Sequence, residues 1–538
     1  MICLSSLDDL FLQDDRNFAL AIGNFDGVHI GHRKLLTTLV SIASRKKLAS
    51  VVITFSPHPS LYFKPEKKDF ILTERATKFK LLKEMGINYV IVIEFVHDVQ
   101  KLSAREFMEN FRFSSSRIKH IHLGHDFQLG AGKEEARDIL LEVKADDCEI
   151  TSEKSLMVGN EKVSSTKIRE LLKSAELFEG VSSFMGREYS LMGTTISGRG
   201  IGKSKLVATL NIKASSQLIK PLEGVYISKI KIDGQIYDSI TNIGNNPTVT
   251  QDKELNIETH IFFFEENVKK GTEVEVFFHR YLRGEKKFGT IQELKNQIEN
   301  DIIVAKKYHR ENSSVKLALL GKNISHSKSQ LMYEKIFKRF IDYKLLDCEN
   351  EKNIPSLDII FETYQGLSIT SPYKKYFLPY TKSSSDFEAI NCIKKQSKYF
   401  ESTNTDFLAV SELVVKYEIK KHDTVILLGS GSMANMMTGI LNKNNIDFIS
   451  LSRKSRNIQN IDNFVAKDSD TCIINCCSRD YRFKSLKLDS ITTFWDFNYD
   501  FYPHEEYFSK SNVNYIDGFE MLMLQAKYAV SFWNFESF

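Results

Sequence analysis

Apolar residues in the first third of the chain form short continuous runs, separated by segments with helical spacing. The runs at residues 18–22, 49–55 and 89–95 are rich in β-branched and aromatic side chains, which is typical of buried strands. Over residues 73–85 and 103–111, apolar side chains recur every three or four positions, which predicts helices. Strands that alternate with helices predict a parallel sheet, with its ligand site at the carboxyl ends of the strands.

From about residue 187 the pattern changes to short strands separated by Gly and Asn turns. No long helical pattern appears before Ile291. Short strands at this spacing predict a small antiparallel barrel. The predicted strands are residues 193–196, 224–232, 237–243, 257–264 and 273–278.

A second α/β pattern begins after a polar segment, with an apolar strand at residues 315–320. Residues 424–428 form another buried strand, followed by a Gly-x-Gly turn and a helical pattern, which is the order of elements in dinucleotide-binding folds. The strand at residues 447–451 ends in the basic segment 452–456. Arginines there favour the 2′-phosphate of NADP over the ribose hydroxyl of NAD, although a basic solvated loop would look the same.

Composition narrows the class of protein. A chain of 538 residues is too long for a single domain of ordinary size. Its 73 basic and 69 acidic residues leave a formal charge of +4, so no overall electrostatic potential favours binding to nucleic acid or to a membrane. No export signal and no membrane-length apolar run is evident, and the seven scattered cysteines suggest neither disulfides nor a zinc site. We therefore expect a cytoplasmic protein that acts on small molecules; its oligomeric state stays open.

The segment from Gly23 to His32 carries the first candidate chemistry. Glycines allow the backbone to approach a phosphate, and the helix start at Gly31 offers unpaired N–H groups and a positive dipole end. A glycine turn with ordinary hydrogen-bonded histidines is the plain alternative, but two histidines flank one glycine between a strand and a helix. Two later segments fit the same site: a strand at residues 121–127 that ends in polar groups, and a hydroxyl-rich helix start at 163–169. Taken alone, the latter is more often an ordinary cap.

In order, the segments 23–32, 54–59, 124–127 and 164–169 resemble the FMN adenylyltransferase half of the bifunctional bacterial riboflavin kinase/FAD synthetase family. The resemblance implies in-line attack of the FMN phosphate on the α-phosphate of ATP, without a covalent intermediate. It implies catalytic roles for His29 and His32. By the same resemblance ATP is bound by Gly23, Phe25, Asp26, Gly31, Ser165, Thr166 and Arg169, and the flavin by Pro57, His58 and Asp126.

The strand around Glu258 holds a carboxylate within a strongly apolar segment, and alternation alone would turn that side chain to solvent. Segments 185–189, 244–248, 257–260 and 281–288 resemble the riboflavin kinase half of the same family. The resemblance implies that Glu258 is the base, that Arg283 binds flavin, and that Thr209 and Asn211 are Mg²⁺ ligands. The family's Gly and Pro in that metal loop are replaced here by Leu206 and Ala208, which leaves kinase activity open.

A Lys and an Asp placed together suit carbonyl reduction, because the ammonium polarises the oxygen and supplies a proton. Segments 325–329, 368–375, 389–391, 402–406, 496–499 and 517–526 resemble shikimate dehydrogenase, with Lys374 and Asp406 matching its catalytic pair. The resemblance implies substrate binding by Ser327, Ser329, Thr370, Asn391, Tyr499 and Gln525, and NADP(H) binding by Gly429, Gly431, Ser452 and Arg453. The chain departs from the family at Gln330, Tyr333, Glu334, Ser368 and Cys392.

The sequence thus predicts a multidomain protein. Its parts are an α/β Rossmann-like nucleotidyltransferase domain (1–180), an antiparallel β-barrel riboflavin kinase domain (181–310) and an α/β shikimate dehydrogenase-like unit (315–538). The last would have a substrate part (315–410 with 515–538) and an NADP-binding Rossmann domain (411–514). The predicted function is ATP- and Mg²⁺-dependent conversion of riboflavin to FMN and FAD, fused to reduction of 3-dehydroshikimate. The alternative is a FAD synthetase whose C-terminal or kinase unit only binds a cofactor or is structural.

Overall fold

The structure is a computed structural model, and it divides the chain into two compact units, residues 1–305 and 306–538. The residues that it describes are 1–64, 66, 68–125, 127–130, 132, 134–176, 178–197, 208–245, 255–384, 388–463, 470–479, 491–499, 501–509 and 511–535. Among these residues, no helix is long and apolar enough to span a membrane.

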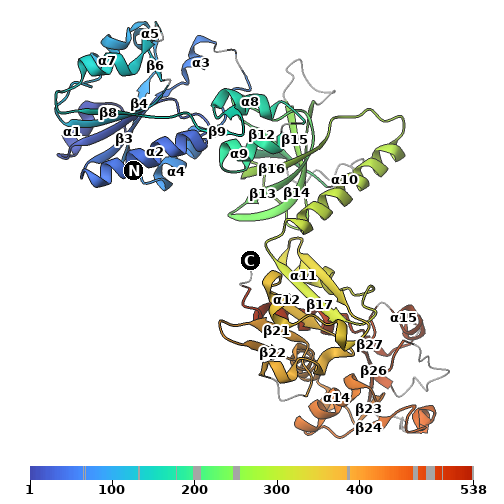
Figure 1. The fold of residues 1–538 in the computed structure, drawn as a ribbon. Coiled ribbons are helices and arrows are strands. Elements are labelled where there is room, and N and C mark those ends of the chain that lie inside the picture. Colours follow the sequence, from blue (N-terminus) through green and yellow to red (C-terminus); the bar gives the residue numbers. More distant parts are fainter. Residues whose placement is uncertain are drawn as a thin grey trace. The chain divides into compact units, whose positions relative to one another are not determined.

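The first unit opens with the predicted parallel sheet, which has six strands in the order β1-β4-β3-β2-β5-β8 (Figure 1). The strands are β1 (Ile2–Leu4), β2 (Phe18–Ile22), β3 (Ala49–Ser56), β4 (Tyr89–Glu94), β5 (Ile118–Gly124) and β8 (Glu149–Glu153). From β2 the chain moves through β3 and β4 in one direction, and from β5 to β8 in the other. The carboxyl ends of β2 and β5 are therefore a topological switch point, where open α/β sheets bind ligands.

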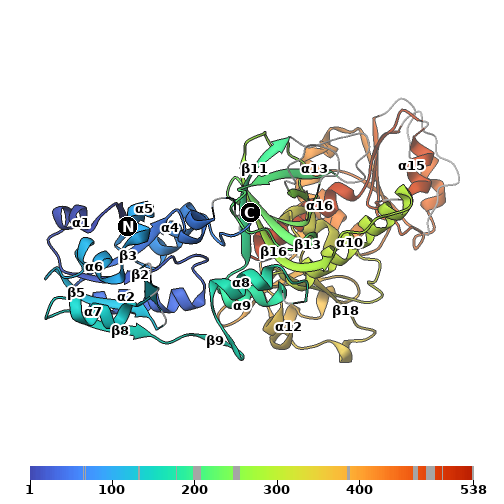
Figure 2. The same cartoon turned by 90° about the horizontal axis from the view of Figure 1, so that it is seen from above.

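A hydrophobic core lies on each face of the sheet, so its central strands are buried on both sides. Figure 2 shows the helices of this part around the strands of the sheet. Leu36, Leu39 and Leu82 belong to one core, and Leu10, Phe107 and Leu140 to the other. The helices are α1 (Leu7–Gln13), α2 (Ile30–Arg45), α3 (Pro59–Phe63), α4 (Arg75–Glu84), α5 (His97–Lys101), α6 (Ala104–Asn110), α7 (Ala136–Val143), α8 (Ser165–Leu172) and α9 (Val181–Met185). Small strand pairs are β6 (Gln128–Leu129) with β7 (Glu134–Glu135), and β9 (Met157–Val158) with β10 (Glu161–Lys162).

The predicted barrel is confirmed as a closed antiparallel barrel in the order β11-β12-β15-β14-β13-β16. Its strands are β11 (Tyr189–Ser197), β12 (Leu210–Ala214), β13 (Gly224–Ile232), β14 (Gln235–Asn245), β15 (Leu255–Ile261) and β16 (Glu273–Arg283), followed by helix α10 (Ile291–Glu311). Strand β12, which no pattern predicted, pairs with both β11 and β15 and so closes the barrel.

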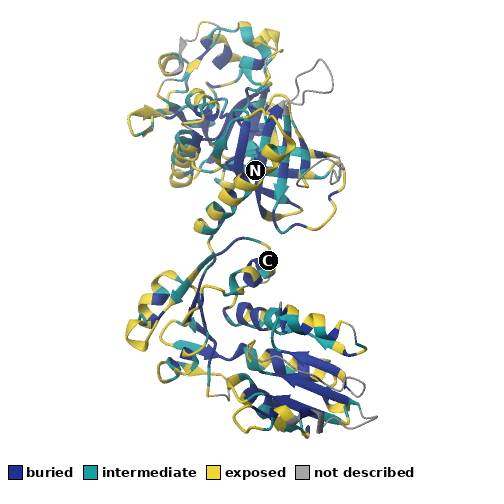
Figure 3. Cartoon of the chain, turned by 90° about the vertical axis from the view of Figure 1, so that its right-hand side faces the viewer, coloured by how far each residue is buried: buried dark blue, intermediate teal, exposed yellow. Residues whose placement is uncertain are grey.

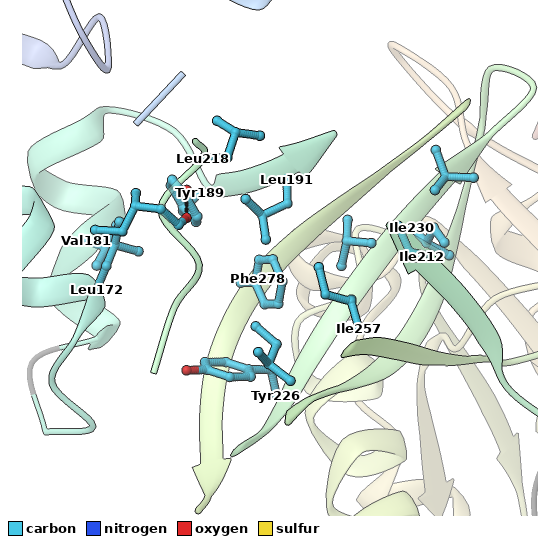
Figure 4. Close-up of a cluster of buried hydrophobic side chains, with 14 of the residues drawn as sticks. Leu172, Val181, Tyr189, Leu191, Ile212, Leu218, Tyr226, Ile230, Ile257 and Phe278 are labelled. Carbon is cyan, nitrogen blue, oxygen red and sulfur yellow. Dashed lines mark hydrogen bonds between the residues drawn. The ribbon is translucent and has the colours of Figure 1, made fainter. Parts of the chain in front are cut away.

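The parallel sheet and the barrel share part of one hydrophobic core within the first unit. Leu172 of α8 and Val181 of α9 lie in the same cluster as Tyr189, Leu191 and other barrel side chains (Figure 4). A parallel β-bridge between Ile71 and Leu218 adds a backbone connection. The two parts are thus joined by burial as well as by the chain.

The second unit holds two further sheets, and their central strands β19, β23 and β25 are almost wholly buried (Figure 3). The mixed sheet has the order β18-β17-β19-β21-β22-β20, and the parallel sheet the order β24-β23-β25-β26-β27. The first comprises β17 (Lys316–Gly321), β18 (Asp342–Asp347), β19 (Gly366–Ile369), β20 (Lys382–Ser383), β21 (Cys392–Lys395) and β22 (Phe400–Thr403). The second comprises β23 (Thr424–Leu428), β24 (Ile449–Leu451), β25 (Thr471–Asn475), β26 (Ile491–Asp496) and β27 (Asn514–Ile516).

Helix α16 returns the chain to the first of these sheets. Its Ala526 and Ala529 lie in one buried cluster with Val315 and Leu317 at the start of the unit. The helices are α11 (Ser329–Phe337), α12 (Leu357–Thr363), α13 (Thr405–Lys416), α14 (Ser432–Lys443), α15 (Tyr502–Phe508) and α16 (Phe519–Phe532), with a 3-10 turn at Tyr373–Lys375. A sheet formed by the beginning of the unit is therefore covered by a helix near its end.

Candidate functional site

The turn between β2 and α2 has an unusual backbone. Phe25, Gly27 and Val28 all have positive φ, at 48°, 88° and 39°. Glycine adopts this region freely, but a side-chain-bearing residue there costs on the order of 1–3 kcal/mol, and a β-branched valine is a clear outlier. Contacts from elsewhere in the fold must hold this turn in place.

Asp26 provides one such set of contacts. Its buried carboxylate accepts hydrogen bonds from the backbone N–H groups of Leu72 and Thr73, and Arg169 lies 2.5 Å from Oδ2. Burial raises the pKa of Asp26, and the Arg169 guanidinium opposes that rise. The Ser165 hydroxyl donates to the Asp26 carbonyl at 2.7 Å. Asp26, Ser165 and Arg169, predicted from two distant segments, are therefore joined.

The two predicted histidines lie against each other at the start of α2. His29 Nδ1 accepts the backbone N–H of His32 at 3.2 Å and caps the helix, and the rings stack with centroids 3.6 Å apart. Burial lowers the pKa of His29 to about 4 and takes the pKa of His32 well below its usual value. Both rings are therefore neutral near pH 7, and each can donate one N–H to an anion.

A cavity of about 1050 Å³ opens over this turn and the start of α8. From the first segment Gly23, Phe25, Asp26, His29, Gly31 and His32 line it, and from the second Ser165, Thr166 and Arg169. His58 also lines it, whereas Pro57 is exposed and is not among the lining residues. Asp126 lies outside the described residues, but its neighbours His125 and Phe127 line the cavity. The cavity is at the switch point of the sheet, where the sequence predicted the site.

Lys78 supports the same turn and was not predicted. Its Nζ donates to the Asn24 carbonyl at 3.1 Å and to the Thr54 hydroxyl at 3.3 Å, and burial lowers its pKa. In the sequence, Lys78 is one of several lysines on an amphipathic helix. Only the packing of α4 beside the turn distinguishes it.

Lowering the pH from 7 to 5 is expected to destabilise the first unit. Because burial lowers the folded pKa of His29 from 6.5 to about 4, the unfolded chain takes up the proton first. This stability is fully present above pH 6.5 and is lost as the pH falls toward 4; at pH 5 the loss is about 2 kcal/mol for His29 alone. Burial also lowers the pKa of His120 to about 4, so this residue acts in the same direction. Urea unfolding with pulse proteolysis of this unit measures the change, and equal stability at the two pH values would contradict it.

A second polar cluster lies on the outer face of the barrel. Glu258 of β15 is paired in register with Asn211 of β12, and Asn256 Nδ2 donates to Glu258 Oε1 at 2.8 Å. The same amide nitrogen lies 3.5 Å from Asn211 Oδ1. The buried Thr209 hydroxyl has no hydrogen-bond partner among the described residues. Glu258 is half-buried rather than fully solvated, and the two predicted metal ligands lie on the adjoining strand and loop.

Arg283 has a different environment from the one its predicted flavin role would suggest. Its guanidinium makes a two-pronged ion pair with the buried carboxylate of Asp301 on α10, with Nη2 to Oδ2 at 2.7 Å. This pair fixes the end of β16 to α10.

In the second unit, the predicted catalytic pair is in direct contact. Lys374 Nζ lies 2.6 Å from Asp406 Oδ2. Both line a cavity of about 400 Å³ that also includes Ser432, Met433 and Met436 from the start of α14. The Gly-x-Gly turn therefore leads into a helix that shares a cavity with the Lys–Asp pair.

Several predicted substrate-binding residues form small networks. Asn391 and Gln525 are both buried and both bond to Thr405, next to Asp406. Ser327 and Ser329 bond to each other, with their hydroxyl oxygens 3.1 Å apart. The Thr370 carbonyl accepts the N–H of Tyr373 in the turn that carries Lys374, and the Tyr499 ring lies near Lys328 and Arg479.

The predicted cofactor-binding residues lie at the carboxyl ends of β23 and β24. Gly429 has φ 118°, and a Cβ there would come within 3.1 Å of the Cys476 backbone, so this position requires glycine. Gly431 caps α14. Ser452 and Arg453 follow β24, where Arg453 Nη2 lies 3.4 Å from the Ser478 hydroxyl.

Four of the departures from the dehydrogenase pattern form polar contacts with the side chains around them. Glu334 is buried and receives a two-pronged ion pair from Arg310, at 2.8 and 3.0 Å. Gln330 donates to the same carboxylate at 3.0 Å. A third departure, Tyr333, donates to or accepts from the hydroxyl of Ser368, which is itself a departure, at 2.9 Å. The side chains at these changed positions therefore serve as hydrogen-bond partners for one another.

A nucleotide-binding parallel sheet followed by a closed six-stranded barrel defines the class of the first unit. Residues 12–167 match the family model of FAD synthetase, and residues 185–309 match that of riboflavin kinase. The chain belongs, over this part of its length, to the family of bifunctional riboflavin kinase/FMN adenylyltransferases. A member from Buchnera aphidicola subsp. Schizaphis graminum is 33% identical over 297 residues, which are 54% of this chain and 94% of that protein.

Solved structures are also similar to parts of this chain. A macrolide-efflux protein from Streptococcus pneumoniae is 25% identical, with TM-score 0.51, and the match covers 58% of this chain and 99% of that one. A chorismate mutase/shikimate 5-dehydrogenase fusion protein from Clostridium acetobutylicum is 23% identical, with TM-score 0.34, and the match covers 41% of this chain and 92% of that one. The chemistry of the second unit must be argued from its own side chains.

Proposed function

We propose that residues 1–180 adenylylate FMN, that residues 181–310 phosphorylate riboflavin, and that residues 315–538 reduce 3-dehydroshikimate with NADPH. The observation that carries the first assignment is the cavity shared by the two histidines and by Ser165, Thr166 and Arg169. Three kinds of phosphate-binding group meet there: neutral imidazoles, hydroxyls at a helix start, and a guanidinium.

In adenylyl transfer, a phosphate oxygen of FMN attacks the α-phosphorus of ATP, and the bond to pyrophosphate breaks. Negative charge develops on the oxygens of the α-phosphate and of the leaving group. His29 and His32 donate side-chain N–H groups to these oxygens, and the positive dipole end at the start of α2 stabilises the same charge. Arg169 remains paired with Asp26, so it keeps α8 and the strained turn together while it faces the phosphates.

For the kinase reaction, Glu258 accepts the proton of the ribityl hydroxyl as that oxygen attacks the γ-phosphate of ATP. Asn256 orients the carboxylate through its hydrogen bond to Oε1. The buried Thr209 hydroxyl and the Asn211 amide are hard oxygen donors, so they fit a Mg²⁺ ion. When bound, Mg²⁺ would offset phosphate charge.

Chromatography of flavins after incubation with riboflavin, ATP and Mg²⁺ tests both assignments in the first unit. We expect FMN and FAD from the unaltered protein. Glu258→Gln should lower FMN formation by about a hundredfold or more, because it removes the base but keeps the shape and the contact with Asn256. FAD formation from supplied FMN should be unchanged in that variant. If the unaltered protein forms neither FMN nor FAD from riboflavin, the kinase assignment is refuted. If it forms no FAD from supplied FMN, the adenylyltransferase assignment is refuted.

The contact between Lys374 and Asp406 supports the reductase proposal. Lys374 donates a hydrogen bond to the substrate carbonyl oxygen and delivers a proton to it, while Asp406 holds the ammonium in position. NADPH, when bound, supplies the hydride. Gly429, where a Cβ would crowd the neighbouring backbone, and the basic side chain of Arg453 fit the diphosphate and the 2′-phosphate of that cofactor. Ser327, Ser329, Asn391 and Gln525 would hold the carboxylate and ring hydroxyls.

A further inference from the structure

The side chain of Arg187 crosses from the barrel to the strained turn. Arg187 lies two residues before β11, the first strand of the barrel. Its Nη1 donates to the carbonyl of Val28 at 3.3 Å, and its Nη2 donates to the hydroxyl of Thr73 at 3.1 Å. Both acceptors belong to the parallel-sheet part of the same unit, more than a hundred positions earlier in the chain.

Both acceptors are supports of the turn. Val28 has φ 39° and directly precedes His29, so the orientation of its peptide group sets the direction in which His29 leaves the turn. The backbone N–H of Thr73 binds Asp26, which holds the other side of the turn. Arg187 thus links the two points at which the unfavourable backbone conformation is fixed.

Neighbouring residues make the fit around Arg187 close. Gly186 has φ 68°, and a Cβ there would lie 2.5 Å from Ile30 Cγ2, so α2 packs directly on the barrel entry. Met185 Sδ lies 3.7 Å from the position that a Cβ of Gly27 would take. Burial, with repulsion from Arg33, lowers the pKa of Arg187 to about 10, so the guanidinium is still charged at neutral pH.

We propose that Arg187 is a positioning residue for adenylyl transfer, although it lies in the segment that leads into the kinase barrel. It is not among the described residues that line the cavity, so it acts through Val28 and Thr73 on the placement of His29. This proposal rests on the adenylyltransferase assignment of the first unit. Its consequence is that a residue beside the barrel sets the geometry of a site whose predicted phosphate-binding groups lie at the starts of α2 and α8.

The test measures both activities in the full chain carrying Arg187→Ala or Arg187→Lys. We expect Arg187→Ala to lower kcat for FMN adenylylation by about ten- to a hundredfold, with KM for ATP changed less than about threefold, because a displacement of 1 Å has effects of this size. Riboflavin phosphorylation should stay within about threefold of the unaltered protein. Arg187→Lys keeps the charge and one hydrogen bond, so its kcat should lie between that of the unaltered protein and that of Arg187→Ala.

Chemical rescue distinguishes positioning from a purely structural role. Ethylguanidinium, added to Arg187→Ala, should restore part of the adenylylation rate, because it can occupy the vacated space between Val28 and Thr73. Arg280→Ala is the matched control: Arg280 is a barrel arginine whose ion pair with Glu179 is exposed, and its loss should change neither activity. An unchanged adenylylation rate in Arg187→Ala would overturn the proposal. So would an equal loss of both activities in Arg187→Ala with no response to ethylguanidinium. Loss of adenylylation in the unaltered protein would instead refute the underlying assignment.

Discussion

Replacing Lys374 by alanine is expected to lower NADPH oxidation with 3-dehydroshikimate by about a hundred- to ten-thousandfold. The ammonium is the group placed to protonate the carbonyl oxygen as the hydride arrives, and positioned general acids contribute rate factors of about this size. Lys374 lies 2.6 Å from Asp406 and lines the cavity next to α14, so its ammonium group can reach a substrate bound there. The loss of NADPH absorbance after addition of substrate measures the rate.

Lys395→Ala is the control for this variant. Lys395 ends strand β21 of the mixed sheet, is exposed, and makes a long ion pair with Asp358, at 3.9 Å, so its removal should leave the rate unchanged. The decisive outcome comes from the unaltered protein. If it binds NADPH but shows no turnover that depends on dehydroshikimate, the second unit is a cofactor-binding module and the reductase proposal fails.

The largest expected effect in the first unit comes from His29→Asn. Asparagine retains an oxygen that can cap α2 as His29 Nδ1 does, so the fold should be preserved while the imidazole is lost. We expect FAD formation from FMN to fall by about a hundred- to a thousandfold, as for removal of a donor to developing charge. Riboflavin phosphorylation in the barrel should not change. Flavin chromatography with supplied FMN measures both.

His97→Asn serves as the matched control, because His97 is exposed and its ion pair is with the exposed neighbour Asp98. It should form FAD at the normal rate. A His29→Asn protein that kept a normal rate would remove His29 from the catalytic machinery. In that case the histidine would remain as a helix cap alone.

The strands of the sheets were the most predictable part of this fold. Residues 18–22 were predicted as a strand from their apolar run, and β2 spans the same residues because a central parallel strand is buried on both faces. The strand predicted at 121–127 is β5, which instead runs from Ile118 to Gly124. Its polar start at Lys119 and His120 hid the boundary, because pairing with β2 and β8 rather than hydropathy determines where it begins.

The candidate sites were predictable where one short segment carries both the turn and the chemistry. Gly23 to His32 combines positive-φ backbone with the two histidines, so its role could be inferred locally. Lys78 and Arg187 could not be inferred, because each acts on a backbone carbonyl far away in sequence. The pairing of Arg283 with Asp301 was missed for the same reason, since nothing local distinguishes an arginine held by a carboxylate from one that awaits a ligand.

The return of α16 to the first sheet of the second unit affects when that site can form during synthesis. Gln525 on α16 bonds to the Thr405 hydroxyl, and the two residues are 120 positions apart. During synthesis, Lys374 and Asp406 therefore leave the ribosome well before α16, the helix that covers Thr405, has been made. Messages truncated before α16 would yield polypeptides with an open, uncovered sheet, so quality-control proteases should remove them more readily than chains truncated after the barrel.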